Sequence, residues 1–277
     1  MSKHDHDAGL AHDLAVWNSR LGRRRLLAWL TYGGLAACGS SASQRDNAAA
    51  ATNSDGSTTD QALGGGDGSC AGTIPEETPG PYPGDGTNGA NALTLDGIVR
   101  SDIRTSVAGA SGVATGVPLT LRLIVVDQSC QPLAGYAVYV WHCDQAGRYS
   151  MYSQGAQNEN YLRGVQESAD DGSVEFTTIF PACYPGRWPH IHFEIYSALA
   201  AAKSGRNAVA TSQLALPKSD CDAVFATAGY EASVNNLAAI SLTSDLVFSD
   251  GVSLQLPAIS GDPQSGYSAT LQVTITP

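Results

Sequence analysis

Short runs of alternating or wholly apolar residues most constrain how this chain can fold. In a strand, successive side chains point to opposite faces, so alternation with a period of two is typical of a half-buried strand. Turn residues such as Asp170, Asp171 and Gly172 separate the runs. The sequence therefore predicts a mostly β domain, an antiparallel β-sandwich with long loops, and a helical piece near 221–228. The runs are residues 119–126, 136–141, 174–179, 190–196 and 269–276.

The N-terminal residues 1–37 have the pattern of an export signal. Three arginines, Arg23 to Arg25, precede an apolar stretch over 26–37 that ends in Leu-Ala-Ala before Cys38. A basic patch followed by a short apolar run is typical of a secretory signal, and paired arginines resemble a twin-arginine signal. The Leu-Ala-Ala-Cys sequence resembles a lipobox, in which Cys38 receives a lipid. The alternative is a short amphipathic helix with an incidental cysteine.

Residues 38–69 separate this signal from the rest of the chain. They are rich in Gly, Ser, Ala, Thr, Asp and Asn, and Leu63 is their only large aliphatic residue. Such a segment buries too little apolar surface to offset the entropy lost on ordering. We therefore predict a disordered tether over 38–69 and one folded domain over 70–277.

Net charge excludes one class of partner. Lys and Arg total 15 against 26 Asp and Glu, a formal charge of −11, and no basic cluster follows residue 25. Binding to nucleic acid depends on neutralising phosphates, so no nucleic-acid partner is expected.

No apolar run is long enough to cross a bilayer, which leaves lipid on Cys38 as the membrane attachment. The expected location is the periplasm or the cell surface, and a homo-oligomer is compatible with the sequence.

The cysteines fit an exported protein. If Cys38 carries lipid, five others remain. An odd number leaves at least one thiol unpaired and permits at most two disulfides, whose connectivity the sequence does not give. Five buried thiols are the alternative. The five residues are Cys70, Cys130, Cys143, Cys183 and Cys221.

The pair His190 and His192 is the sharpest local feature. Residues i and i+2 of a strand share a face, so both imidazoles point the same way, opposite to Ile191 and Phe193. Two imidazoles on one face can hold a metal ion; two histidines without a ligand are the alternative. Tyr184 lies just upstream, and a Lewis-acidic ion can turn a tyrosine into a ligand. Ferric iron, a hard ion, suits phenolate and imidazole.

Several blocks in the same order resemble the intradiol ring-cleavage dioxygenases, the family of catechol and protocatechuate dioxygenases. The Trp-His-Cys-Asp block places the chain closest to a small exported branch of that family. The resemblance covers about residues 70–215 and extends more loosely to 277. The blocks are residues 76–82, 141–150, 160–166, 174–181, 184–192 and 211–214.

The resemblance implies a non-haem ferric site and an activity. The reaction would cleave catechol-type aromatic rings between the two hydroxyl-bearing carbons, using dioxygen, and would give muconate-type diacids in aromatic-compound catabolism. Tyr184 would leave the metal and take up a substrate proton, Arg187 would stabilise negative charge on the ring, and Gln213 would assist. The implied metal ligands are Tyr149, Tyr184, His190 and His192. The implied substrate-mouth residues are Gly80, Pro81 and Tyr82.

One position departs from the family pattern. Cys183 stands where the family has a bulky residue, directly before Tyr184. A free thiol beside a ferric centre could be oxidised, so we expect Cys183 in a disulfide, with Cys221 as the candidate partner.

Two other functions remain open at the level of sequence. His142 could join His190 and His192 in a three-histidine zinc or copper enzyme. In the main interpretation His142 is instead structural. Alternatively, the domain could be a non-catalytic, transthyretin-like binding sandwich, since a fold alone does not establish a function.

Overall fold

The computed structural model describes residue 70 and residues 72–277. The predicted signal over 1–37, the predicted tether over 38–69 and Cys38 lie outside the described residues. Among the residues that are described, no helix is long and apolar enough to span a membrane.

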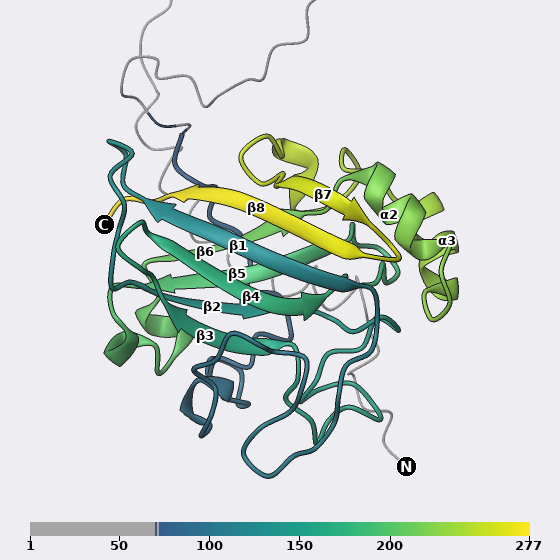
Figure 1. Cartoon of the computed structure of the whole chain (residues 1–277), viewed down its shortest axis with the longest axis horizontal. Coiled ribbons are helices and arrows are strands. Elements are labelled where there is room, and N and C mark those ends of the chain that lie inside the picture. The colour runs from purple at the N-terminus through teal and green to yellow at the C-terminus, as the bar shows by residue number, and fades with distance from the viewer. Residues whose placement is uncertain (1–69, 71) are drawn as a thin grey trace, which may run out of the picture. The chain divides into compact units, whose positions relative to one another are not determined.

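Two four-stranded sheets make up the domain, and Figure 1 shows one lying in front of the other. The first has the order β4-β1-β8-β7 and the second β3-β2-β5-β6. The first sheet consists of β1 (Pro118–Val126), β4 (Ser173–Ile179), β7 (Ala258–Asp262) and β8 (Gly266–Thr274). The second consists of β2 (Ala137–Trp141), β3 (Arg163–Glu167), β5 (His190–Tyr196) and β6 (Ala210–Ala215).

Few helices accompany the sheets. The α-helices are α2 (Lys218–Phe225) and α3 (Glu231–Ala238), and α2 overlaps the helical piece expected near 221–228. The short 3-10 helices are η2 (Ala92–Thr94), η3 (Leu199–Ala201), η4 (Gly205–Asn207) and η5 (Phe248–Asp250). The mostly β architecture predicted from the alternating runs is confirmed.

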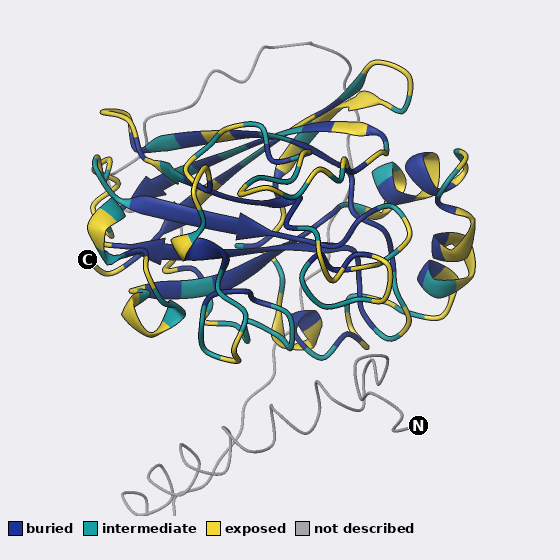
Figure 2. Ribbon diagram, turned by 90° about the horizontal axis from the view of Figure 1, so that it is seen from below, coloured by how far each residue is buried: buried dark blue, intermediate teal, exposed yellow. Residues whose placement is uncertain are grey.

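The core lies between the two sheets. On β5, Ile191 and Phe193 are fully buried and point to one face, and on β1 Leu121 and Leu123 are equally buried. Figure 2 shows buried residues concentrated along the strands. Each such side chain contributes roughly 1.5–3 kcal/mol when fully buried, so the alternating residues define which faces of the sheets meet.

One strand pair departs from the antiparallel pattern. β8 runs parallel to β1, with Leu119 opposite Tyr267 and Val125 opposite Val273, whereas the other strand pairs are antiparallel. Parallel neighbours cannot be joined by a hairpin and need a long connection. Here that connection contains the whole second sheet and both α-helices.

The second face of the β3-β2-β5-β6 sheet is covered by the chain itself. All seven residues of β5 are buried, although its alternation predicts a half-exposed strand. Residues 77–83 cross this face: the Glu77 amide donates to the Thr211 carbonyl of β6, and the Pro83 carbonyl accepts a hydrogen bond from the Tyr139 hydroxyl of β2. The histidine face of β5 therefore looks into an enclosed site.

The disulfide expected at Cys183 is wrong. Cys70 and Cys130 form a disulfide, while Cys143, Cys183 and Cys221 are buried free thiols. The Cys183 Sγ contacts the Arg187 carbonyl at 3.4 Å, and the Cys221 Sγ contacts the Leu216 carbonyl at 3.8 Å. Both thiols thus satisfy their weak donors on nearby backbone oxygens.

Candidate metal centre

The two histidines of β5 face each other across the covered side of the sheet. The Nε2 atoms of His190 and His192 are 3.1 Å apart, and both residues are buried. The His190 Nδ1 lies 2.5 Å from the Trp188 carbonyl and donates its proton there. The Nε2 of His190 is then unprotonated, with its lone pair directed at the site.

Two tyrosines from separate loops complete this group. Tyr149 follows β2, and Tyr184 lies between β4 and β5. Their hydroxyls are 3.4 Å and 3.2 Å from the His190 Nε2. Tyr149 is buried, whereas Tyr184 is half-buried. The structure thus brings the four predicted ligands together, two nitrogens and two oxygens, around one point.

The electrostatics of this group favour a hard cation. Burial lowers the pKa of both His190 and His192, which keeps the imidazoles neutral and able to coordinate. Burial also raises the pKa of Tyr149, so a phenolate there needs a compensating positive charge. A multivalent, Lewis-acidic cation would supply it. Across the described residues, no group of three or more His, Cys, Asp and Glu side chains could hold a metal.

Aromatic packing fixes the second histidine. Trp141, its cross-strand neighbour, stacks on His192 with ring centroids 4.8 Å apart and planes within 6°. Gly80 lies against the Cε1 edge of this imidazole, and a Cβ added to Gly80 would stand 3.4 Å from the His192 Cε1. Gly80 also has φ +70°, a region that favours glycine. The backbone at Gly80 therefore lies beside His192, with space for no more than van der Waals contact between an added Cβ and the ring.

The predicted mouth residues lie at this site. We call residues 80–84, which include them, the strap. The Tyr82 ring packs on Tyr149 with centroids 5.1 Å apart and on Tyr152 at 5.2 Å. The Pro81 carbonyl accepts a hydrogen bond from Asn88. Gly80, Pro81 and Tyr82 thus belong to the wall beside the four ligands.

Arg187 and Gln213 also meet at the site. Nη2 of Arg187 donates to the Gln213 Oε1 at 2.7 Å, and Gln213 Nε2 donates to the Thr78 carbonyl. Gln213 lies opposite His192 in the register of β5 and β6. Burial opposes the charge of Arg187, but Tyr184 and Asp245 outweigh it, so the guanidinium pKa is raised and the group stays cationic.

His142 does not join the two other histidines. Its Nδ1 lies 2.8 Å from the Cys143 carbonyl and its Nε2 lies 2.7 Å from the Thr178 hydroxyl. Both ring nitrogens are therefore engaged within the protein, in keeping with a structural role. The three-histidine site gains no support from this geometry.

Sequence reasoning missed Asp245. Its buried carboxylate accepts hydrogen bonds from Nε of Arg187 at 3.0 Å and from the Trp188 amide at 2.7 Å. The amides of Val247 and Phe248 donate to the same carboxylate. No local motif marks Asp245, because its two partners at the site, Arg187 and Trp188, lie nearly 60 residues away in the chain. The burial of Asp245, which marks it as unusual for an acidic residue, is visible only in the folded structure.

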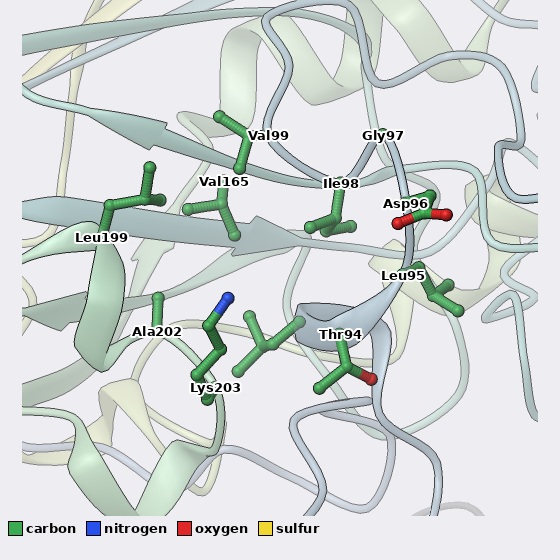
Figure 3. Close-up of a pocket in the computed structure, with 11 residues that line it drawn as sticks. Thr94, Leu95, Asp96, Gly97, Ile98, Val99, Val165, Leu199, Ala202 and Lys203 are labelled. Carbon is green, nitrogen blue, oxygen red and sulfur yellow. The ribbon is translucent and has the colours of Figure 1, made fainter.

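A cavity of about 300 Å³ lies elsewhere in the domain. Figure 3 shows apolar side chains around it, among them Ile98, Val165 and Leu199, together with Asp96 and Lys203. None of the residues that line it belongs to the predicted site. This cavity therefore does not bear on the metal centre.

Comparisons with known proteins agree with this geometry. A family model described as Dioxygenase matches residues 100–208, a range that holds all four converging ligands. The chain is 32% identical over 96 residues to catechol 1,2-dioxygenase 1 of Acinetobacter lwoffii, covering 34% of this chain and 29% of that relative. It is 40% identical over 60 residues to a chlorocatechol 1,2-dioxygenase of Rhodococcus opacus, covering 22% and 23%. These matches span less than a third of either relative.

A solved structure is similar over a longer range. The intradiol ring-cleavage dioxygenase from Tetranychus urticae aligns with a TM-score of 0.56 and 27% identity. The alignment covers 75% of this chain and 96% of that one. The sandwich type expected from the sequence is confirmed by this likeness.

Proposed function

We propose that this chain, which belongs to the intradiol ring-cleavage dioxygenase family, is a non-haem ferric enzyme. It opens catechol-type rings between the two hydroxyl-bearing carbons and releases muconate-type diacids. Catechol and one dioxygen together have the composition of muconic acid, so no other oxidant is needed. The substrates are a small aromatic diol and dioxygen.

One observation carries this proposal: the two phenol oxygens of Tyr149 and Tyr184 and the Nε2 of His192 all lie within 3.4 Å of the Nε2 of His190. Phenolate and neutral imidazole suit ferric iron, whereas softer ions prefer thiolates. Tyr149, Tyr184, His190 and His192 would hold the ion. Bound iron supplies the Lewis acidity and redox chemistry that make a chelated catechol reactive towards dioxygen.

The chain's own residues handle protons and charge. Tyr184 is the more exposed of the two tyrosines, so in this proposal it is the one that moves when a diol enters. Its oxygen can then hold a proton released by the diol. Arg187 keeps a fixed positive charge among the tyrosines, because Asp245 and Gln213 hold its guanidinium. In a site closed to water, such a preset charge stabilises negative charge on the reacting ring.

The strap and the aromatic rings exclude water and shape the entrance. Gly80 lies against His192, and Tyr82 lies against Tyr149. These residues form the wall where a flat diol would enter beside the ligands. Gly80, Pro81 and Tyr82 are therefore the substrate-contacting residues of the proposal.

The proposal extends to where the enzyme works. The basic and apolar pattern before Cys38 supports export and a lipid anchor on that cysteine, at the periplasm or the cell surface. The Cys70–Cys130 disulfide in the folded domain suits an oxidising compartment. Mass spectrometry of the purified membrane fraction would detect the lipid, and an unmodified Cys38 would exclude the anchor.

A visible spectrum with an iron assay tests the ferric site. The full chain should bind about one iron per molecule and show a red-brown phenolate-to-iron band. Anaerobic catechol should shift that band, and admission of oxygen should yield the diacid. Redox-inert gallium is the matched control, since it should bind without colour or turnover. A chain that stays colourless after ferric reconstitution would overturn the proposed function.

A further inference from the structure

Arg163, at the start of β3, is 1% exposed and contacts two segments that border the proposed site, at Ser150 and Tyr82. A guanidinium has five N–H donors. Each of the five has an oxygen partner here, at 2.6 to 3.1 Å. The acceptors are the Ser150 hydroxyl for Nε, the Pro83 carbonyl and Tyr139 hydroxyl for Nη1, and the Tyr82 and Ser150 carbonyls for Nη2.

None of these acceptors is a carboxylate. Within the described residues, no Asp or Glu side chain forms an ion pair with Arg163. Burying a charge without a charged partner is costly, and neutral oxygens offset that cost only when the geometry is complete. A buried leucine or methionine would avoid the cost altogether. The placement of Arg163 therefore calls for a role beyond filling space.

The acceptors belong to segments that carry the site. Ser150 directly follows Tyr149, and both its hydroxyl and its carbonyl bind the guanidinium. Tyr82 and Pro83 belong to the strap. One side chain thus ties the loop of a proposed iron ligand to the wall that touches His192.

The fit between the strap and Arg163 is tight. At Gly84, with φ +62°, an added Cβ would lie 2.7 Å from the Arg163 Nη1. The Gly84 amide donates to the Tyr152 hydroxyl, and the Tyr152 ring lies 5.5 Å from the Arg163 guanidinium carbon. The strap therefore rests on the guanidinium itself, and its position depends on that group.

From this geometry we propose that Arg163 is a positioning residue, which holds the Tyr149 loop and the strap in register across the metal centre. A lysine cannot replace it, because three donors on one nitrogen cannot reach acceptors on three sides. The part that concerns Tyr149 rests on the proposed iron chemistry. The part that concerns the strap does not, because the strap is held in the metal-free chain.

The test compares the full chain carrying Arg163→Lys or Arg163→Met with the wild type. In metal-free protein, amide exchange across the strap should become roughly tenfold faster. In iron-loaded protein, the phenolate band should shift because Tyr149 is displaced, and the KM for catechol should rise more than kcat falls. Wild-type exchange together with a wild-type band would overturn the proposal.

Two further variants separate positioning from general destabilisation. Val273→Ala lowers stability in the other sheet, at a fully buried residue of β8. It should leave strap exchange and the band unchanged; the same changes in this variant would overturn the proposal. If the Arg163 variants do not fold, Ser150→Ala decides, since of the five acceptors around Arg163 it removes only that of Nε, together with the hydroxyl's own donation to the Tyr161 carbonyl. Ser150→Ala should shift the phenolate band in the direction given for the Arg163 variants and should also speed amide exchange in the strap. Both effects should be smaller than those expected of the Arg163 variants.

The same experiments distinguish failure of this proposal from failure of the proposed function. A wild-type chain that binds no iron overturns the function but leaves the exchange measurement intact. A coloured, active wild type whose Arg163 variants keep both the band and the strap exchange overturns only the positioning role.

Discussion

Arg187 and Asp245 form a buried ion pair, with Nε of the arginine 3.0 Å from Oδ2 of the aspartate. Their side chains are 3% and 0% exposed, so water screens the pair little. The aspartate also binds the Trp188 amide beside Arg187. It therefore fixes both the direction of the guanidinium and the backbone that carries it.

Asp245→Asn should weaken both the fold and the reaction. Removing one charge of a buried pair leaves the other uncompensated, which costs roughly 3–5 kcal/mol. A loosened Arg187 should slow ring cleavage by roughly 10- to 100-fold while iron stays bound. Chemical denaturation and turnover measure the two effects. Asp171→Asn, in the exposed pair with Arg122, is the control and should change stability by at most about 1 kcal/mol.

Arg187→Ala should leave iron and colour in place, since the guanidinium is not among the four converging ligands. It should lower kcat by roughly 100- to 1,000-fold, the usual loss when a preset charge at a developing anion is removed. Stopped-flow measurement of ring cleavage in the iron-loaded chain checks this. Turnover at the wild-type rate would remove the catalytic role of Arg187.

His192→Ala should lose iron and activity together. The imidazole is one of two nitrogens in the group, and its neighbours Trp141 and Gly80 cannot coordinate in its place. An iron assay and the visible band measure the loss. The matched control is Gln166→Ala on β3, which should keep both, because this half-buried side chain donates to the Glu175 carbonyl and not to any of the four ligands. Full iron and full turnover in the His192 variant would contradict the ligand assignment.

The sequence predicted the parts of this molecule that depend on local periodicity. Alternation located β1 and β5, and the i, i+2 spacing put His190 and His192 on one face. The order of the motifs identified Tyr149, Tyr184, Arg187 and the other predicted site residues. The fold then brings these residues together.

Contacts between segments that are distant in the chain could not be predicted from the sequence. Asp245 meets Arg187 only because the loop after α3 folds back onto the site, 58 residues away. The same holds for the parallel pairing of β1 with β8 and for the strap that encloses β5. The disulfide expected between Cys183 and Cys221 failed because the direction of a Sγ depends on side-chain packing rather than on spacing.

Glu77 predicts a pH dependence of stability. Burial, followed by the nearby charge of Asp250, raises its pKa from 4.5 to about 7. Between these values the folded carboxyl keeps its proton while the unfolded one has released it, so stability falls as pH rises through this window. Above a pH of about 7, the stability contributed by this shifted pKa is lost completely.

Glu77→Gln should remove this part of the pH dependence. Glutamine keeps an oxygen near the Gln255 amide, which lies 3.2 Å from Glu77 Oε1, but has no proton to lose. The Tm of the metal-free full chain, measured at about pH 5.5 and about pH 8, should therefore fall less in the variant than in the wild type. The variant should also be the more stable of the two at the higher pH, because a buried negative charge near Asp250 has been removed. Parallel pH profiles for the two proteins would show that Glu77 ionises normally in the folded chain.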